Sequence, residues 1–271
     1  MRVYSGELRE RVDRKDLIIT GGIMDSRSGA VVELYQDAGY DCLLIDREHT
    51  PLNTETVCEH IRISRALGLP VMVRAADDSY HELCRTLDQA PDGIYVPRIS
   101  SRAQVEEIVR NISYPPKGVR GVAGSTCPVG KYYGWSHVTE QMRTVNDLLV
   151  FGIQIETKEA LDDLDGILSV PGVDIAVIGG DDLSARMGIP GQWDTEVFHQ
   201  AVEEVFAACN RHGVLPGIAG GDPETIAHWI SIGARVIWYA SDIYLLWAAA
   251  SKQITDLDAA LAAKGMEGMR K

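Results

Sequence analysis

Polar and ionisable side chains follow several short apolar runs in this sequence. They are Asp46, Arg47, Glu48 and His49 after LLI, Arg74 after PVMV, Arg98 after YVP, Gln154 and Glu156 in QIE, and Asp181 and Asp182 in GGDD. If the runs are strands of one parallel barrel, their carboxyl ends meet at one face. Carboxylates, a guanidinium and an imidazole gathered there can bind a cation, stabilise a developing anion and transfer a proton.

Two carboxylates on neighbouring strands suit a hard divalent cation such as Mg²⁺ or Mn²⁺, which prefers oxygen ligands. Two protein ligands leave most of the coordination shell open. A 2-oxo acid can fill two open positions through its keto and carboxylate oxygens, and the cation then acts as a Lewis acid on an enolate. The pattern therefore favours metal-assisted enolate chemistry.

The other side chains suit the remaining tasks of such a reaction. Arg74 could hydrogen-bond the developing enolate oxygen, where negative charge appears in the transition state. His49, oriented by Asp46, could move a proton through a bound water. Backbone N–H groups at the start of a helix beginning near Asp182 could receive the substrate carboxylate, because helix N-termini favour anions.

Each of these residues also has a structural interpretation. Asp182 could cap a helix, and Glu156 could be a first-turn carboxylate favoured by a helix dipole. His49 could be a surface residue, and Arg74 could form a lone ion pair. The functional interpretation depends on their convergence at strand ends.

The elements that would position these residues alternate between strands and helices. We predict strands over Leu17–Ile23, Asp41–Ile45, Pro70–Arg74, Gly93–Pro97, Leu148–Glu156, Val173–Ile178, Val214–Ala219 and Arg235–Tyr239. Helices are predicted over Ser28–Ala38, Thr54–Leu67, Tyr80–Gln89, Arg102–Asn111, Lys158–Leu168, Thr195–His212, Pro223–Ile232 and Asp242–Leu261. This order predicts an α/β protein with one (β/α)₈ TIM-barrel domain over residues 1–271, with a doubly wound sheet as the alternative.

Two segments lie outside this alternation. A short N-terminal helix within Ser5–Arg14 would cap the barrel floor. Residues 113–147 form a long Gly- and Pro-containing excursion between the fourth helix and the fifth strand. A connection from a helix to the next strand lies at the barrel floor, so this excursion must run along the outside of the barrel to reach the active face. The sequence does not indicate its role.

Composition narrows the function classes. The chain of 271 residues has 26 Lys and Arg against 39 Asp and Glu, a net charge of −13, so nucleic-acid or anionic-membrane binding is not expected. No apolar run has the length of a membrane span, and the polar N-terminus lacks the apolar core of a signal peptide. We therefore expect a cytoplasmic protein that acts on small molecules.

Five motifs, in order along the chain, resemble those of a known family: LLIDREHTPLN, PVMVR, YPPKGVRGV, QIETKEA and VIGGDDLSARMG. The sequence is similar over nearly its whole length to the metal-dependent class II pyruvate aldolases of the HpcH/HpaI group, which includes 4-hydroxy-2-oxoheptanedioate aldolase and 2-keto-3-deoxy sugar-acid aldolases. The resemblance implies a (β/α)₈ barrel lyase that reversibly cleaves a 4-hydroxy-2-oxo acid to pyruvate, or a close 2-oxo acid, and an aldehyde, with Mg²⁺, Mn²⁺ or Co²⁺.

The resemblance also implies roles for individual residues. Glu156 and Asp182 would bind the metal, with Gln154 near it and Glu48 supporting its bound waters. Arg74 would bind the keto oxygen, and His49 with Asp46 would act as the acid–base pair. Gly180, Asp181 and Asp182 would bind the substrate. Family members are commonly hexamers that exchange C-terminal helices. We therefore expect a homo-oligomer, a hexamer or trimer, with IYLLWAAASKQI as an interface. Alternatively, this segment is the eighth barrel helix packing on its own sheet.

The sequence departs from the family pattern at two positions. Arg47 replaces a small or apolar residue, and it could either attract an acceptor bearing a carboxylate or form a salt bridge. Asp181 adds a carboxylate that would repel the substrate carboxylate unless its side chain points away.

Three other functions use the same residues differently. Decarboxylation of oxaloacetate, or another carbon–carbon lysis, would proceed through the same enolate as the aldol cleavage. A Schiff-base aldolase is disfavoured because no predicted strand ends in Lys, and Lys158 is the nearest candidate. A non-catalytic binding barrel would leave the charges with structural roles only.

Overall fold

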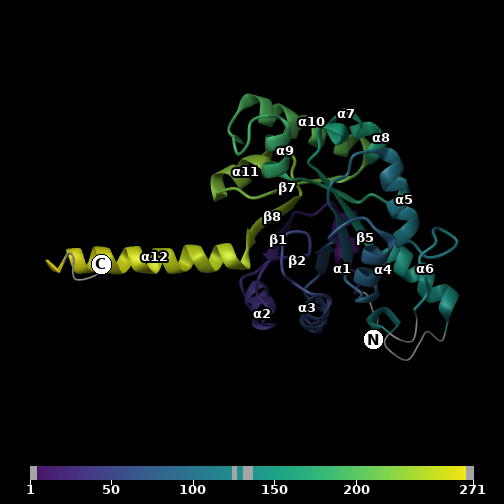
Figure 1. Ribbon diagram of the computed structural model, residues 1–271, viewed down its shortest axis with the longest axis horizontal. Coiled ribbons are helices and arrows are strands. Elements are labelled where there is room, and N and C mark those ends of the chain that lie inside the picture. Colours follow the sequence, from purple (N-terminus) through teal and green to yellow (C-terminus); the bar gives the residue numbers. More distant parts are fainter. Residues whose placement is uncertain (1–4, 124–126, 131–136, 267–271) are drawn as a thin grey trace.

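The computed structural model describes residues 5–123, 127–130 and 137–266. Within this part of the chain, eight parallel strands close into a barrel in their order along the sequence (Figure 1). They are β1 (Ile18–Ile23), β2 (Cys42–Asp46), β3 (Val71–Arg74), β4 (Gly93–Val96), β5 (Val150–Ile155), β6 (Ile175–Ile178), β7 (Leu215–Ala219) and β8 (Val236–Ser241). The predicted TIM barrel is confirmed, and the doubly wound sheet is wrong because β1 pairs with β8.

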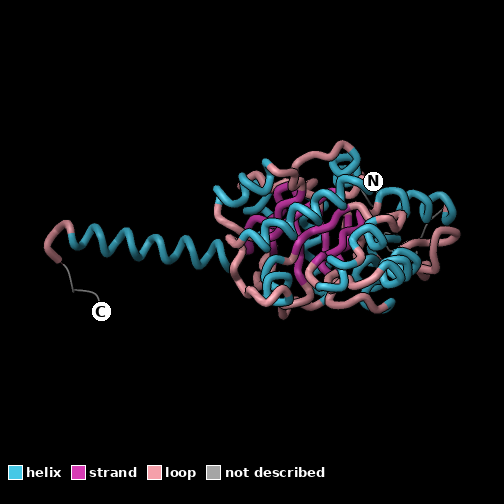
Figure 2. The backbone as a smooth tube through the Cα atoms, turned by 90° about the horizontal axis from the view of Figure 1, so that it is seen from above, coloured by secondary structure: helices cyan, strands magenta, loops and turns pink. Residues whose placement is uncertain are grey.

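Helices surround the strands (Figure 2). They are α1 (Glu7–Asp13), α2 (Ala30–Asp37), α3 (Thr54–Leu67), α4 (Tyr80–Asp88), α5 (Arg102–Ile112), α6 (Val138–Leu148), α7 (Lys158–Asp162), α8 (Leu164–Leu168), α9 (Gly180–Arg186), α10 (Glu196–His212), α11 (Pro223–Ser231) and α12 (Asp242–Ala262), with a 3₁₀ turn at Pro128–Gly130. The side chains of Asn53, Ser79 and Ser101 accept hydrogen bonds from first-turn amides of α3, α4 and α5. These caps set where each helix begins, just after the loops at the barrel mouth.

The barrel interior is filled by inward-facing strand residues, because successive side chains of a strand point to opposite faces. Leu44, Met72 and Val177 belong to one buried interior cluster, which Leu8 and Val12 of α1 join. The N-terminal helix therefore closes the barrel floor, as predicted.

Three predicted elements differ from the structure. The excursion over residues 113–147 contains α6, so β5 begins at Val150 rather than at Leu148. The predicted helix over residues 158–168 is divided at Asp163 into α7 and α8. The helix expected to start near Asp182 is α9, and it begins at Gly180.

The excursion packs on the outside of the barrel. Ala90, Tyr114, Val129 and Val145 form a small apolar cluster that is separate from the barrel interior. The amide of Gly121 donates a hydrogen bond of 2.9 Å to the hydroxyl of Tyr80, at the first residue of α4. Residues 124–126 and 131–136 of this segment lie outside the described residues.

The prediction that the last helix packs on its own barrel is wrong. The helix α12 projects away from the barrel (Figures 1 and 2), and none of its residues is buried. The carboxylate of its first residue, Asp242, accepts hydrogen bonds from the amides of Met24, at 2.9 Å, and Ser26, at 2.7 Å. This clamp fixes the start of α12 to the loop after β1.

Among the described residues, no helix combines the length and the apolar character that crossing a membrane requires.

The buried carboxyl group of Asp92, at the start of β4, gives a prediction about stability. Its Oδ2 accepts a hydrogen bond of 3.0 Å from the amide of Val71. Burial raises the pKa of Asp92 to about 6, although the hydrogen bond from Val71 opposes the rise. The folded protein therefore holds this proton more tightly than the unfolded chain does. Its contribution to stability is present below pH 4, roughly the pKa of an unfolded aspartate, and is lost as the pH rises through about 6.

We expect Asp92→Asn, which keeps an oxygen acceptor without the charge, to raise the free energy of unfolding at pH 8 by about 1–3 kcal/mol. The gain should shrink toward pH 5. Urea unfolding at both pH values measures it, with the exposed Asp147→Asn on α6 as the control. An unchanged midpoint at pH 8 would contradict the prediction.

Candidate active site

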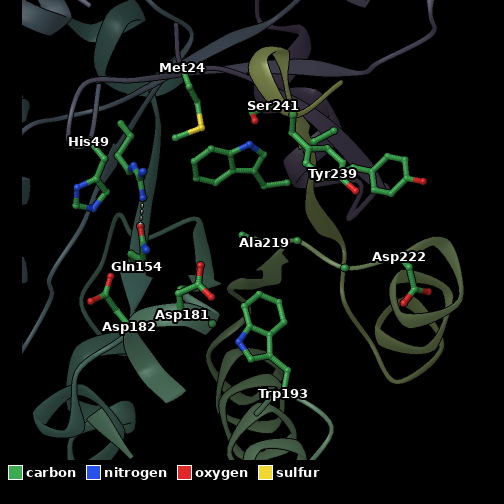
Figure 3. Close-up of a pocket in the computed structure, with 18 residues that line it drawn as sticks. Met24, His49, Gln154, Asp181, Asp182, Trp193, Ala219, Asp222, Tyr239 and Ser241 are labelled. Atoms are coloured by element: carbon green, nitrogen blue, oxygen red, sulfur yellow. Dashed lines mark hydrogen bonds between the residues drawn. The ribbon is translucent and has the colours of Figure 1, made fainter. Parts of the chain in front are cut away.

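A pocket of about 570 Å³ opens at the carboxyl ends of the strands (Figure 3). Its lining residues lie at the ends of seven of the strands and in the loops and helices that follow them: Met24, His49, Arg74, Gln154, Gly179, Gly180, Asp181, Asp182, Trp193, Ala219, Gly220, Gly221, Asp222, Trp238, Tyr239, Ala240, Ser241 and Tyr244. Most of the residues predicted to share one mouth are therefore brought together here. Asp46, Glu48 and Glu156 lie behind this lining, in contact with Arg74, Gln154 or His49.

The innermost charged group is the ion pair between Arg74 and Asp46. Nε and Nη2 of Arg74 donate to the two carboxylate oxygens of Asp46 over 2.7 and 2.8 Å. Burial by itself would lower the pKa of Arg74, but the hydrogen bonds and the charge of Asp46 outweigh it and raise the pKa. The guanidinium therefore stays charged and is fixed in one plane.

Two further residues restrain the guanidinium of Arg74. Its Nη1 donates to Oε1 of Gln154 over 3.3 Å. The indole of Trp238, on β8, lies 4.8 Å from the guanidinium carbon. A cation against an aromatic face adds electrostatic attraction to this packing. Arg74 thus enters the pocket in a single, well-determined orientation.

The prediction that Asp46 orients the imidazole of His49 needs correction. The Asp46 carboxylate accepts the backbone amides of Glu48, at 2.9 Å, and His49, at 3.4 Å. The imidazole Nε2 instead lies 3.5 Å from Oε2 of Glu48. The physical reason is that Arg74 already occupies both carboxylate oxygens of Asp46. Asp46 therefore positions Arg74 and the loop that carries His49, and Glu48 is the carboxylate beside the imidazole.

Glu156 and Gln154 lie side by side at the end of β5, as the two-residue period of a strand predicts. Nε2 of Gln154 donates to Oε2 of Glu156, and the backbone amide of Arg98 donates to Oε1 over 2.7 Å. Burial raises the pKa of Glu156 to about 7, and the charges of Glu48 and Asp182 add to the rise, while the Arg98 amide opposes it. Burial likewise raises the pKa of Glu48, partly offset by Arg74.

The chemistry of these donors fits a hard divalent cation. The charges of Glu48 and Asp182 raise the pKa of Glu156, and the charge of Asp182 raises the pKa of Glu48. A cation between carboxylates relieves such repulsion. Oε2 of Glu48 is a buried oxygen that accepts no hydrogen bond from the described residues, although Nη1 of Arg74 lies 3.3 Å from it in an ion pair. Across those same residues, no group of three or more His, Cys, Asp or Glu side chains could bind a metal. Water and substrate would therefore have to complete the shell of a cation held by Glu156 and Asp182.

The first turn of α9 presents main-chain donors to the pocket. Gly180, Asp181 and Asp182 are its first three residues, and no described side chain caps this end of the helix. Their amides therefore have no acceptor within the helix. The side chain of Asp181 is exposed and lines the pocket, so it does not point away from the site (Figure 3).

Arg47 does not line the pocket. Its guanidinium lies 2.6 Å from Glu82 and donates to Thr86 over 3.1 Å, both on α4. The salt-bridge interpretation is therefore the one that the structure supports, and the attraction of an acceptor carboxylate by Arg47 is not. Similarly, Lys158 is exposed at the first residue of α7 and does not reach the barrel interior.

Sequence reasoning missed the two tryptophans of the pocket. Trp238 lies two residues after the inward-facing Val236, so the strand period places it inside the barrel mouth. Trp193 lies between α9 and α10, where no periodic pattern indicates its direction. Each indole packs against glycine, Trp238 against Gly22 and Trp193 against Gly180, where an added Cβ would lie 2.3 and 2.4 Å from the ring.

The closed parallel barrel and the charged centre at the carboxyl ends of its strands define the class of (β/α)₈-barrel enzymes. The sequence profile of the HpcH/HpaI aldolase/citrate lyase family matches residues 24–247. The 4-hydroxy-2-oxo-heptane-1,7-dioate aldolase of Shigella sonnei (strain Ss046) is 32% identical over 218 residues, which cover 80% of this chain and 82% of that protein. The chain therefore belongs to the HpcH/HpaI aldolase/citrate lyase family, which confirms the predicted family and its carbon–carbon lyase class.

Solved structures agree with this assignment. The HpcH/HpaI aldolase from Desulfitobacterium hafniense DCB-2 has a TM-score of 0.87 at 27% identity, covering 93% of this chain and 96% of its own. Citrate synthase SbnG has a TM-score of 0.83 at 27% identity, covering 97% of this chain and 100% of its own. The same barrel thus carries more than one reaction on carbon–carbon bonds.

The ion pair of Asp46 with Arg74 gives a second prediction. Asp46→Asn leaves the buried guanidinium poorly compensated, so we expect it to lower the free energy of unfolding by about 3 kcal/mol. The double variant Asp46→Asn/Arg74→Met should lose less than the sum of the two single variants, because it removes both partners of this ion pair instead of leaving one of them unpaired. Urea unfolding measures all three.

The exposed pair of Lys252 and Asp256 on α12 serves as the control, with side chains 74% and 61% exposed. Asp256→Asn should cost less than about 0.5 kcal/mol. The prediction would be contradicted if the stability loss of the double variant at residues 46 and 74 equalled the sum of the losses of the two single variants.

Proposed function

We propose that this protein is a divalent-metal-dependent aldolase that reversibly cleaves a 4-hydroxy-2-oxo acid to pyruvate, or a close 2-oxo acid, and an aldehyde. The observation that carries the proposal is the buried Arg74 beside Gln154 and a set of carboxylates at the pocket floor. Membership of a family that contains named aldolases supports it. We also propose that the chain is one barrel domain acting in the cytoplasm.

Glu156 and Asp182 would hold the cation, which we expect to be Mg²⁺, Mn²⁺ or Co²⁺. When bound, such a cation supplies Lewis acidity that favours enolate formation. Glu48 would accept hydrogen bonds from waters around it. Gln154 holds Glu156 in place through its amide.

The other residues would bind the substrate and move protons. Amides of Gly180, Asp181 and Asp182 would receive the substrate carboxylate, and Arg74 would donate a hydrogen bond to the keto oxygen. His49 would take the proton of the C4 hydroxyl through a water. The C3–C4 bond then breaks, its electron pair enters the enolate of pyruvate, and the aldehyde leaves. A proton delivered to C3 completes pyruvate.

Decarboxylation of oxaloacetate, or another carbon–carbon cleavage, is the second candidate because it needs the same enolate. The likeness to citrate synthase SbnG at 27% identity favours keeping it. Comparing the turnover of oxaloacetate with that of 4-hydroxy-2-oxo acids separates the two. A non-catalytic barrel would show neither turnover.

The proposed function predicts metal-dependent exchange of the methyl protons of pyruvate in deuterated water. We expect EDTA to abolish the exchange and Mg²⁺, Mn²⁺ or Co²⁺ to restore it. Glu156→Gln and Asp182→Asn should each slow it at least about a hundredfold, because each removes charge at the reacting centre. Proton NMR measures the rate, with Asp147→Asn as the control. Full exchange in EDTA, or trapping of pyruvate on Lys158 by borohydride, would contradict the metal mechanism.

We also propose that the protein is a homo-oligomer, a hexamer or trimer, in which α12 packs on a neighbouring copy. Its side chains include Leu246 and Trp247, which are 66% and 64% exposed, and also Ile243, Tyr244, Leu245, Ile254 and Leu257. An exposed apolar surface of this kind indicates an interaction site. Nucleic acid and anionic membranes are not expected as partners, because the chain has a net charge of −13.

The proposed assembly predicts that Leu246→Glu/Trp247→Glu dissociates the oligomer, because each substitution would bury a charge in the interface. Light scattering coupled to gel filtration should show the mass falling to that of one chain. Lys252→Gln, on the same helix, should leave the mass unchanged. A double variant with the mass of the wild type would show that α12 does not join the copies.

A further inference from the structure

We propose that the pocket selects an uncharged, hydroxyl-bearing aldehyde as the acceptor half of the reaction, and that Asp181 sets this preference by disfavouring an aldehyde with its own carboxylate. This inference rests on the proposed aldolase function and names the substrate class of the same site. It is carried by the aromatic walls of the pocket and by the way in which its charges are paired.

One wall of the pocket is Trp193. Its indole packs against Gly180 and Gly220, where an added Cβ would lie 2.4 and 3.2 Å from the ring. On its other side it stacks on Phe198, with ring centroids 5.7 Å apart and an angle of 13° between the planes. The ring is therefore fixed and gives the carbon chain of an acceptor a flat apolar surface.

The other aromatic wall is Trp238, which stacks on Arg74 and fills the space left by Gly22. Both indoles line the same pocket as Asp181 (Figure 3). Substrate atoms beyond the keto acid would thus meet two aromatic surfaces and a carboxylate. Apolar walls with a few polar groups are typical of sites that bind small molecules.

Arg74 and Arg47, two cations at or near the pocket, are already paired. Arg74 donates to both oxygens of Asp46, and Arg47 forms its ion pair with Glu82 outside the pocket. Apart from Arg74, the lining residues within the described chain include no Lys or Arg. An acceptor carboxylate would therefore find no unpaired guanidinium or ammonium group on these walls.

Asp181 is the pocket carboxylate with no assigned partner. Asp222 also lines the pocket, but it caps α11 by accepting hydrogen bonds from the amides of Glu224 and Thr225. Among the described residues, no hydrogen bond or ion pair holds the Asp181 side chain. Its oxygens can accept hydrogen bonds from acceptor hydroxyls, and its charge repels a second carboxylate. Repulsion of this kind is a common means of specificity.

The test compares two acceptors of equal chain length, succinic semialdehyde and 4-hydroxybutanal, in metal-supported addition to pyruvate. We expect the wild type to favour 4-hydroxybutanal in kcat/KM by at least about tenfold, or about 1.4 kcal/mol. Asp181→Asn should reduce this ratio about tenfold, Asp181→Glu should keep it, and Asp222→Asn should change it less than about threefold. Because the donor is the same in both reactions, any effect of Asp181 on pyruvate binding cancels in the ratio.

Two results would overturn the inference: a wild type that favours succinic semialdehyde, or a ratio that is the same in Asp181→Asn. If the activity of Asp181→Asn is too low to measure, the ratio of the two kcat/KM values of the wild type is compared at low and high salt. Because salt screens charges, high salt must lower this ratio if the preference is electrostatic. A salt-independent ratio would reject the electrostatic role. Proton exchange of pyruvate without acceptor reports separately on the proposed aldolase function, so the two failures are distinguishable.

Discussion

The buried ion pair between Asp46 and Arg74 is the constraint on which the site depends. The two residues face each other in the register of β2 and β3, at the last position of both strands. A guanidinium so deeply buried is stable only with its carboxylate, and that carboxylate also fixes the amides of Glu48 and His49. One pair of charges thus orients the guanidinium that lines the pocket and the loop that carries the imidazole.

Much of the fold and part of the site could be predicted from the sequence. The strands follow from short apolar runs, and the convergence of Arg74, Gln154 and Asp182 follows from the rule that all parallel strands of a barrel end at one face. The partner of the His49 imidazole could not be predicted. The partner depends on which side chain binds the carboxylate oxygens of Asp46, and the spacing of residues in the sequence does not determine this.

The other misses have a similar cause. The strand period places Trp238 inside the barrel, but its contact with Arg74 depends on the shape left by Gly22, a residue from another strand. Likewise, the apolar pattern of α12 fits both a barrel helix and an exposed arm. Its start is held in place by Asp242, which binds amides more than 200 positions away in the chain. Contacts between distant residues, rather than local propensity, decide these features.

The same Asp242 connects the arm to the pocket. Its carboxylate binds the amide of Met24, and both Met24 and Tyr244 line the pocket. One side of the pocket is therefore built from the loop after β1 and the first turn of α12, joined by a single carboxylate. Any contact that displaces the start of α12 would also move this wall. If α12 joins copies of the chain, as we propose, the assembly and the shape of the pocket are coupled through Asp242.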